Sequence, residues 1–157
     1  MPIDLAAFEK MKRKGEELYK SLSEIHCPYF NDKVHFNARG LEHLKFKRQG
    51  HARPRQDQYM RFKLLHLAPF ILRNSKTLQG RWETRAFEKE RIHGKTTSVL
   101  KDVEYYEFVA IIENVRVKVI VKRIENGQRF FWSIIPCWGN DRRTGKRKLF
   151  SGRPEED

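Results

Sequence analysis

The segment 115–122 alternates apolar and polar residues with a period of two. Valines occupy the odd positions, whereas Arg116, Lys118 and Lys122 occupy three of the even positions. Successive side chains of a β-strand point to opposite faces, so this pattern predicts a strand with one buried face. Similar patterns occur over residues 103–112 and 128–135. We therefore expect three consecutive antiparallel strands.

Two short turns set the register expected for these strands. Asn126-Gly127 is a strong hairpin signal, because a type I′ turn needs positive φ at both central residues. Glu113-Asn114 is a weaker signal of the same kind. Two-residue loops at both places predict the pairs Ile111–Arg116, Val109–Lys118, Tyr105–Lys122, Lys122–Phe131, Ile120–Ser133 and Lys118–Ile135.

This register predicts one apolar face and one mixed face. The apolar face, which should carry the helices, holds Tyr106, Phe108, Ala110, Ile112, the valines of 115–121, Phe130, Trp132 and Ile134, with Arg123 near its end. The mixed face holds Tyr105, Glu107, Val109, Ile111, Arg116, Lys118, Ile120, Lys122, Arg129, Phe131 and Ser133. A bulge in "VKRIEN" would exchange Lys122 and Arg123 between the faces, so the sequence leaves that choice open.

The preceding part of the chain has mainly helical periodicity. We expect a helix over 4–25, a second helix after the capping residue Asn37, and a third helix from about residue 56 that breaks near Pro69. We also expect a short strand at 33–36, a possible strand at 81–87 and a loop at 92–98.

Helices followed by a meander predict an α+β fold, in which N-terminal helices pack on one face of a small, about four-stranded antiparallel sheet. We divide the chain into an N-terminal helical extension (1–30), a main domain (31–138) and a loose basic polar tail (139–157).

The charge balance adds a partner class to this picture. The 157 residues include 33 Lys and Arg against 20 Asp and Glu, a formal net charge of +13. Such an excess is typical of proteins that bind a polyanion, either nucleic acid or an acidic membrane surface. No apolar run approaches the roughly 20 residues that span a bilayer, and the N-terminus lacks a signal-peptide pattern. We expect a cytoplasmic protein without a membrane partner.

The chemistry expected of the mixed face is metal-independent. The six His residues show no familiar metal-ligand spacing and no phosphate-binding glycine loop is present, so we expect neither a metal nor another cofactor. RNA cleavage fits these residues, because the 2′-OH is the nucleophile and the protein needs only a base, an acid and cations. His43 titrates in the right range, and neighbouring cations should keep Glu107 ionised.

Less specific interpretations also fit. A single His on a short helix is usually a packing or surface residue. The mixed face is also compatible with a solvated surface whose lysines oppose edge aggregation and pair with Glu107.

Three segments, "VHFNARGLEHLKFKRQGHARPR", "YMRFKLLHLAPFILRNSKTLQG" and "YYEFVAIIENVRVKVIVKRIENGQRFFWSIIP", make residues 33–136 similar to the phage-associated nucleases of the barnase, EndoU, colicin and RelE-like superfamily. The resemblance implies a metal-independent ribonuclease, often a toxin with an antitoxin partner. It matches the family's helix histidine to His43, its strand cation to Lys122 or Arg123, and its last-strand hydroxyl to Ser133.

The candidate catalytic residues are therefore His43, Glu107, Lys122 and Ser133. The candidate substrate-binding residues are Arg116, Lys118, Arg123, Tyr105, Phe131, Lys45, His51 and Arg61. The expected partners are RNA and an antitoxin, immunity protein or other acidic protein, for a chain that is phage-encoded or delivered to a target cell. Two alternatives stay open: a non-catalytic nucleic-acid-binding module, and a basic interaction protein that docks an acidic partner.

Overall fold

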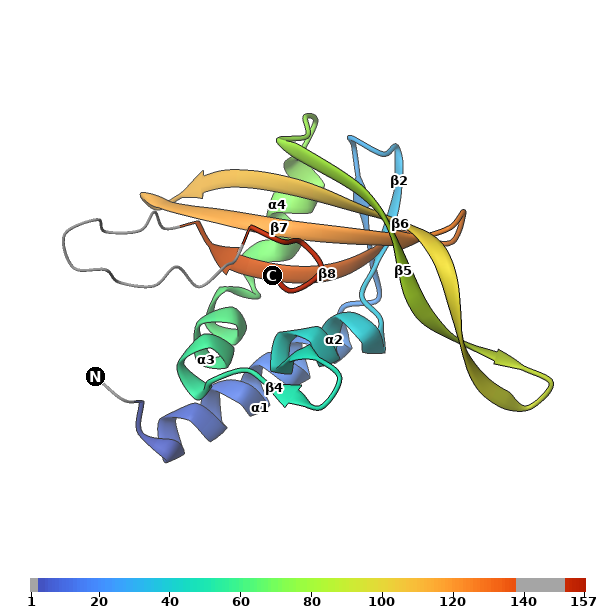
Figure 1. The fold of residues 1–157 in the computed structure, drawn as a ribbon. Coiled ribbons are helices and arrows are strands. Elements are labelled where there is room, and N and C mark those ends of the chain that lie inside the picture. Colours follow the sequence, from blue (N-terminus) through green and yellow to red (C-terminus); the bar gives the residue numbers. More distant parts are fainter. Residues whose placement is uncertain (1–2, 138–151) are drawn as a thin grey trace.

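The computed structural model describes residues 3–137 and 152–157. Its helices are α1 (Leu5–Ser21), α2 (Ala38–Lys45), α3 (Arg55–Leu64) and α4 (Leu67–Asn74) (Figure 1). Its strands are β1 (Glu24–Cys27), β2 (Asp32–His35), β3 (Phe46–Arg48), β4 (His51–Ala52), β5 (Gly80–Ile92), β6 (Lys95–Ile112), β7 (Val115–Ile124) and β8 (Phe130–Pro136). No helix in this part of the chain is long and apolar enough to cross a membrane.

The main sheet is larger than the sequence predicts and is mixed. Its six strands run in the order β1-β2-β8-β7-β6-β5, and β3 and β4 form a separate two-stranded sheet. All neighbours in the main sheet are antiparallel except β2 and β8, which are parallel and pair at His35 and Phe130. The α+β class is correct, whereas the small four-stranded antiparallel sheet is wrong. Helix α1 ends at Ser21 and frees residues 24–27 to form a hairpin with β2.

The strands β5 and β6 form a hairpin that extends far beyond the sheet. They pair continuously from Gly80–Glu107 to Ile92–Lys95, around a turn at His93 and Gly94 with φ values of 50° and 78°. A tight turn therefore replaces the loop expected over 92–98. Strand β7 pairs with β6 only from Val103 onward, so residues 86–101 form a two-stranded projection, which we call the arm.

The expected register of β6 and β7 is confirmed. Val109 pairs with Lys118 and Tyr105 with Lys122. Glu113 and Asn114 both have positive φ, 51° and 66°, as a two-residue type I′ turn requires.

The register of β7 and β8 changes part-way along the pair. Ile120 pairs with Ser133 and Lys118 with Ile135, as expected, but Lys122 pairs with Phe130 and not with Phe131. The irregularity leaves Trp132 as one extra residue on β8, which is a β-bulge. The loop before β8 is also longer than predicted, and its positive φ of 52° falls at Glu125 rather than at Asn126-Gly127.

This bulge reverses the expected faces of three aromatic residues, Phe130, Phe131 and Trp132. Phe131 lies in the main core, where its ring stacks on Phe36 at 5.1 Å between centroids. Phe130 and Trp132 lie instead on the side of Lys122, in a second apolar cluster with Tyr105 and Ile120. The sequence therefore placed all three aromatic residues of "FFW" on the wrong face.

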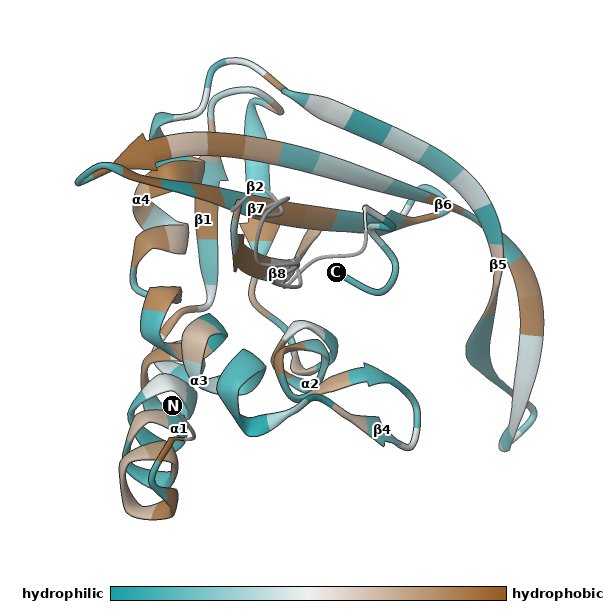
Figure 2. Cartoon of the chain, turned by 60° about the vertical axis from the view of Figure 1, so that its left-hand side comes forward, coloured by the Kyte–Doolittle hydropathy of each residue, from teal (hydrophilic) through white to brown (hydrophobic). Residues whose placement is uncertain are grey.

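The valine face packs against α4, in line with the apolar face that the alternation predicts. Val117, Val119 and Val121 are fully buried in the main core with Ile71 and Leu72 of α4. Figure 2 shows hydrophobic residues gathered where the sheet meets α4. Tyr19, Ile25 and Cys27 also belong to this core, so the segment expected as a helical extension packs with the rest of the chain.

Capping and proline signals in the sequence predict the start of α2 and the break between α3 and α4. The Asn37 side chain accepts a hydrogen bond from the Gly40 backbone at 3.1 Å and caps α2, as predicted. The break expected near Pro69 occurs at Leu65–His66, because a proline ring clashes with the residue four positions earlier. Gly40 permits close packing of α2, since a Cβ atom there would lie 2.2 Å from the Phe131 carbonyl oxygen.

Candidate active site

A buried cluster of polar side chains lies between β7–β8 and the helices α2 and α3. We call it the basic cluster, and its members are His43, Arg53, Arg61, Lys122, Trp132 and Ser133, each at most 9% exposed. They come from α2, the segment between β4 and α3, α3, β7 and β8. Charged side chains are almost never buried without partners, so these contacts need an explanation.

One acidic side chain on α3 links the two arginines. Asp57 lies four residues from each of them, and its Oδ1 accepts a 2.6 Å hydrogen bond from Arg61 Nε. Its Oδ2 lies 3.5 Å from Arg53 Nη1. Burial is the main reason that the pKa of Arg53 falls, to about 10, and the nearby Arg61 adds to this effect. Burial also lowers the pKa of Arg61, and Asp57 opposes the decrease at both residues. Arginine keeps its proton in proteins, so both guanidiniums are charged near neutral pH.

His43 is held between an aromatic ring and a guanidinium. Its ring stacks on Trp132 with 3.8 Å between centroids, and its Nε2 lies 3.0 Å from Arg53 Nη2. Arginine can only donate, so Nε2 is the acceptor and the ring proton lies on Nδ1. Burial, followed by the charges of Arg53, Arg61 and Lys122, lowers the pKa of His43 well below its usual value. His43 is therefore neutral in this arrangement.

Lys122 of β7 lies on the same side of the sheet as Trp132 of β8, and it forms an ion pair with a residue of the arm. Its Nζ is 2.9 Å from Oε1 of Glu88 and 4.0 Å from the centroid of the Trp132 ring. Glu88 also accepts from Arg39 of α2 at 2.5 Å. Burial alone would raise the pKa of Glu88, but these two cations outweigh it and keep the carboxylate ionised. Burial lowers the pKa of Lys122, and Glu88 opposes this effect.

Residues 152–157 fill the space in front of the basic cluster. The main-chain oxygen of Asp157 accepts hydrogen bonds from Arg61 Nη1, from Ser133 Oγ at 2.6 Å and from Arg53 Nη2 at 3.3 Å. Figures 1 and 2 place this end of the chain beside β8 and on the side of α2. The sequence predicts a loose tail over 139–157. Residues 139–151 lie outside the described residues, but residues 152–157 are packed against the cluster.

The remaining candidate residues lie outside this cluster. Glu107 pairs with Lys118 at 2.5 Å and, with Arg116, lines a shallow depression farther along the sheet. Lys45 lies 3.5 Å from Glu16, His51 is exposed on β4, and Arg123 donates to the Gly127 carbonyl from the opposite face of β7 to Lys122. Tyr105 is buried beside Lys122, whereas Phe131 is in the main core. Of these two residues, Lys122 lies in the basic cluster and Arg123 does not.

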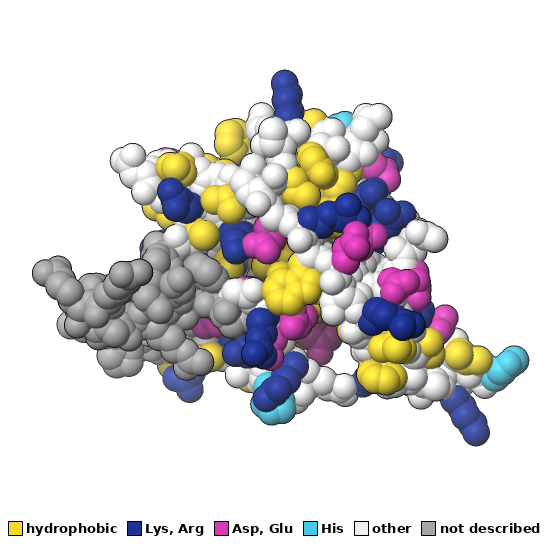
Figure 3. All heavy atoms as spheres, turned by 45° about the horizontal axis from the view of Figure 1, so that its top comes forward, with side chains coloured by type: hydrophobic (Ala, Val, Ile, Leu, Met, Phe, Trp, Pro, Cys, Tyr) yellow, Lys and Arg dark blue, Asp and Glu magenta, His cyan; other side chains and the backbone are white. Residues whose placement is uncertain are grey.

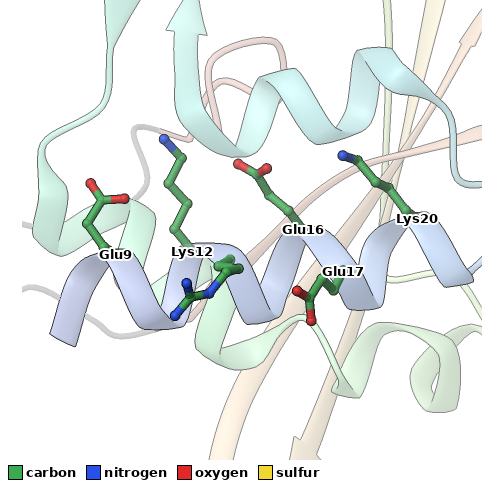
Figure 4. A pocket seen from close by; sticks show the side chains of 6 residues that line it. Glu9, Lys12, Glu16, Glu17 and Lys20 are labelled. Atoms are coloured by element: carbon green, nitrogen blue, oxygen red, sulfur yellow. The ribbon is translucent and has the colours of Figure 1, made fainter. Parts of the chain in front are cut away.

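The exposed charges do not form a continuous basic surface on the side seen in Figure 3, where basic and acidic side chains are interspersed. Opposite charges also pair on β5 and β6, where Arg81 lies 2.8 Å from Glu104 and Arg85 lies 3.4 Å from Asp102. A second depression lies on α1, lined by Glu9, Lys12, Arg13, Glu16, Glu17 and Lys20 (Figure 4). Its three acids balance its three bases, so it offers little attraction for a polyanion.

Sequence reasoning did not assign four residues to this site, which are Arg53, Asp57, Glu88 and Trp132. The spacing of Arg53, Asp57 and Arg61 at steps of four in "RPRQDQYMR" could have indicated that Asp57 pairs with both arginines. Glu88 and Trp132 had no comparable local signal, because the bend of the arm and the bulge of β8 bring them to the site.

The described residues contain no group of three or more His, Cys, Asp or Glu side chains that could hold a metal ion. No family model matches the chain, and searches of curated proteins and solved structures find no match either.

Proposed function

We propose that this chain is a metal-independent ribonuclease whose active site is the basic cluster. The observation that carries the proposal is the convergence of three donors on one oxygen atom. Arg53, Arg61 and Ser133 all donate to the main-chain oxygen of Asp157, beside His43. Guanidinium and hydroxyl groups arranged in this way suit a phosphate oxygen, and the buried setting strengthens their effect on developing charge.

The proposed reaction uses RNA's own 2′-OH as the nucleophile. Nε2 of His43 accepts the 2′-OH proton as the oxygen attacks phosphorus, and the bond from phosphorus to the 5′-oxygen breaks. Lys122 donates a proton to that leaving oxygen. Arg53 and Arg61 stabilise the charge on the phosphorane, and Ser133 orients a non-bridging oxygen. The products are a 2′,3′-cyclic phosphate and a 5′-hydroxyl end.

This scheme removes one catalytic role assigned from the sequence, that of Glu107, and adds a role for Glu88. Glu107 has its ionic partner in Lys118, at 2.5 Å, so it is left out of the reaction. Glu88 serves as the counterion of Lys122. The scheme also requires the phosphate to draw the Arg53 guanidinium away from His43, because Arg53 now occupies the acceptor nitrogen at 3.0 Å.

Transfer RNA, ribosomal RNA and a random oligoribonucleotide incubated with the protein in excess chelator would test this activity. We expect cleavage that leaves cyclic phosphate ends, and a loss of at least about 100-fold in His43→Ala, the usual effect of removing a general base. Lys122→Ala should cause a comparable loss. The exposed His66 and Lys76 provide matched controls, as His66→Ala and Lys76→Ala. Equal cleavage by all four variants would show that the active site lies elsewhere.

A non-catalytic nucleic-acid-binding module is the second candidate. It is favoured by the hydrogen bond from Arg53 that occupies His43 Nε2. Such a module would bind RNA with a steep dependence on salt concentration, because binding releases counterions, and would show no turnover.

A further inference from the structure

We infer that residues 152–157, which we call the strap, regulate the basic cluster by occupying the position of its anionic ligand. This inference rests on the proposed function for the identity of that ligand, a phosphate of RNA. The strap and the phosphate would use the same donors and therefore exclude one another.

The strap contacts the cluster mainly through its own backbone. Besides the three hydrogen bonds to Asp157, Arg53 Nη2 donates to the Glu156 carbonyl at 2.9 Å. The Trp132 indole nitrogen donates to the Pro154 carbonyl at 3.0 Å. Pro154 and Asp157 are both buried, so the strap covers the indole as well as the guanidiniums. A nucleotide would need both surfaces, because bases stack on aromatic rings while cations hold the phosphate.

The acidic side chains of the strap complement the positive charge of the site. Glu155 acts electrostatically on Lys122, and the Glu156 carboxylate lies 3.7 Å from Lys47 Nζ. The Asp157 carboxylate accepts from the Gly152 backbone at 3.0 Å, which holds the strap in a closed turn. Negative side chains and carbonyl oxygens thus stand where an RNA backbone would bring its phosphates.

The fit of the strap is incomplete, as expected of a displaceable element. Glu155 Oε2 is buried without a hydrogen-bond partner among the described residues. A buried unsatisfied carboxylate oxygen lowers the stability of the closed arrangement. Release of the strap would rehydrate this oxygen and expose the Arg53, Arg61 and Ser133 donors together.

Closure of the strap should reduce the apparent affinity for a ligand by the fraction of molecules that are open. A strap that is closed about 90% of the time weakens binding about tenfold. The effect can be measured with a fluorescein-labelled oligodeoxynucleotide in excess chelator, because this probe has no 2′-OH and is not cleaved by the proposed reaction.

Two variants open the strap in different ways. Glu155→Lys with Glu156→Lys turns attraction to Lys122 and Lys47 into repulsion in the full chain. A chain that ends at Ser151 lacks the strap and adds no cation. The control is Glu9→Lys with Glu17→Lys on the exposed surface of α1 (Figure 4). It changes the net charge by the same amount as the double substitution in the strap.

We expect both strap variants to bind the probe about tenfold more tightly than the unaltered chain, and the α1 control to change much less. Their cleavage of RNA should also rise. Circular dichroism reports whether the shortened chain is folded, and the charge-reversed full chain decides the question if it is not.

Unchanged affinity in the folded strap variants, or an equal gain in the α1 control, would overturn the inference. Lower RNA cleavage with unchanged probe binding would also overturn it, since the strap would then belong to the catalytic machinery. Tighter binding without any cleavage would support the strap and count against the ribonuclease proposal, so the two failures are distinguishable.

Discussion

Lys122 Nζ and Glu88 Oε1 lie 2.9 Å apart, although β6 separates their strands in the sheet. Lys122 pairs with Tyr105, and Tyr105 pairs with Trp82 on β5. Glu88 is six residues beyond Trp82, a distance of about 20 Å along a straight strand. The arm must therefore bend over the face of the sheet that carries Lys122 for this ion pair to form. Figure 2 shows that curvature.

The Lys122–Glu88 pair should be asymmetric in its effect on stability. Glu88→Gln leaves Lys122 buried without the carboxylate at 2.9 Å and should cost about 3 kcal/mol of unfolding free energy. Lys122→Met should cost less, because Glu88 retains Arg39 at 2.5 Å. Urea denaturation of both single variants and the double variant would measure the coupling.

The exposed pair Lys33–Glu24 is the matched comparison for that cycle. Its side chains are 57% and 39% exposed, so solvent screening should make its coupling much weaker than that of a buried pair. A coupling for Lys122–Glu88 no larger than this one would contradict the buried ion pair.

Ser133→Ala should destabilise the protein because the hydroxyl both accepts from Arg61 and donates to Asp157. Its removal leaves buried polar groups with one partner fewer, which costs about 1–3 kcal/mol. Ser98→Ala, at an exposed position on β6, should stay within about 0.5 kcal/mol of the unaltered protein. Thermal and urea unfolding would compare them, and similar stabilities for the two variants would refute the prediction.

His43 should make the folded state less stable as the solution becomes more acidic. Its pKa is held well below the usual 6.5, mainly by burial and then by Arg53, Arg61 and Lys122, while a hydrogen bond with the Asp157 backbone opposes them. The unfolded chain therefore takes up a proton below about pH 6.5 that the folded chain does not, and stability falls by up to about 1.4 kcal/mol per pH unit.

Urea titrations between pH 6.5 and 5 would isolate this effect from Glu88, whose own lowered pKa affects stability only as the pH falls below the carboxylate's usual 4.5. His43→Gln should flatten the slope, whereas His66→Gln at an exposed position should preserve it. A slope that survives in His43→Gln would assign the pH dependence to another group.

Gly40→Ala should destabilise the fold even though alanine favours helices over glycine by about 1 kcal/mol. The added Cβ would lie 2.2 Å from the Phe131 carbonyl oxygen and 2.4 Å from the Tyr19 hydroxyl. Overpacking of this kind typically costs about 1–3 kcal/mol. A higher melting temperature in Gly40→Ala would show that α2 can move away from β8 at little cost.

The sequence by itself determined the features that depend on neighbouring residues. Alternation fixed which side of β7 packs against α4, the Glu113-Asn114 turn fixed its register with β6, and Asn37 fixed the start of α2. It also identified Lys122 and Ser133 as residues of one side of the sheet. Periodicity, turn geometry and capping act over a few residues, so a single segment reveals them.

Tertiary structure alone decided the composition of the site. The bulge at Trp132 moved Phe131 into the core, and the bent arm brought Glu88 to Lys122. The packing of α2 and α3 on β8 placed His43 and Arg61 beside Ser133. These residues are separated by tens of positions in the chain, and only the packing of whole elements, with the strap against them, sets the distances between them.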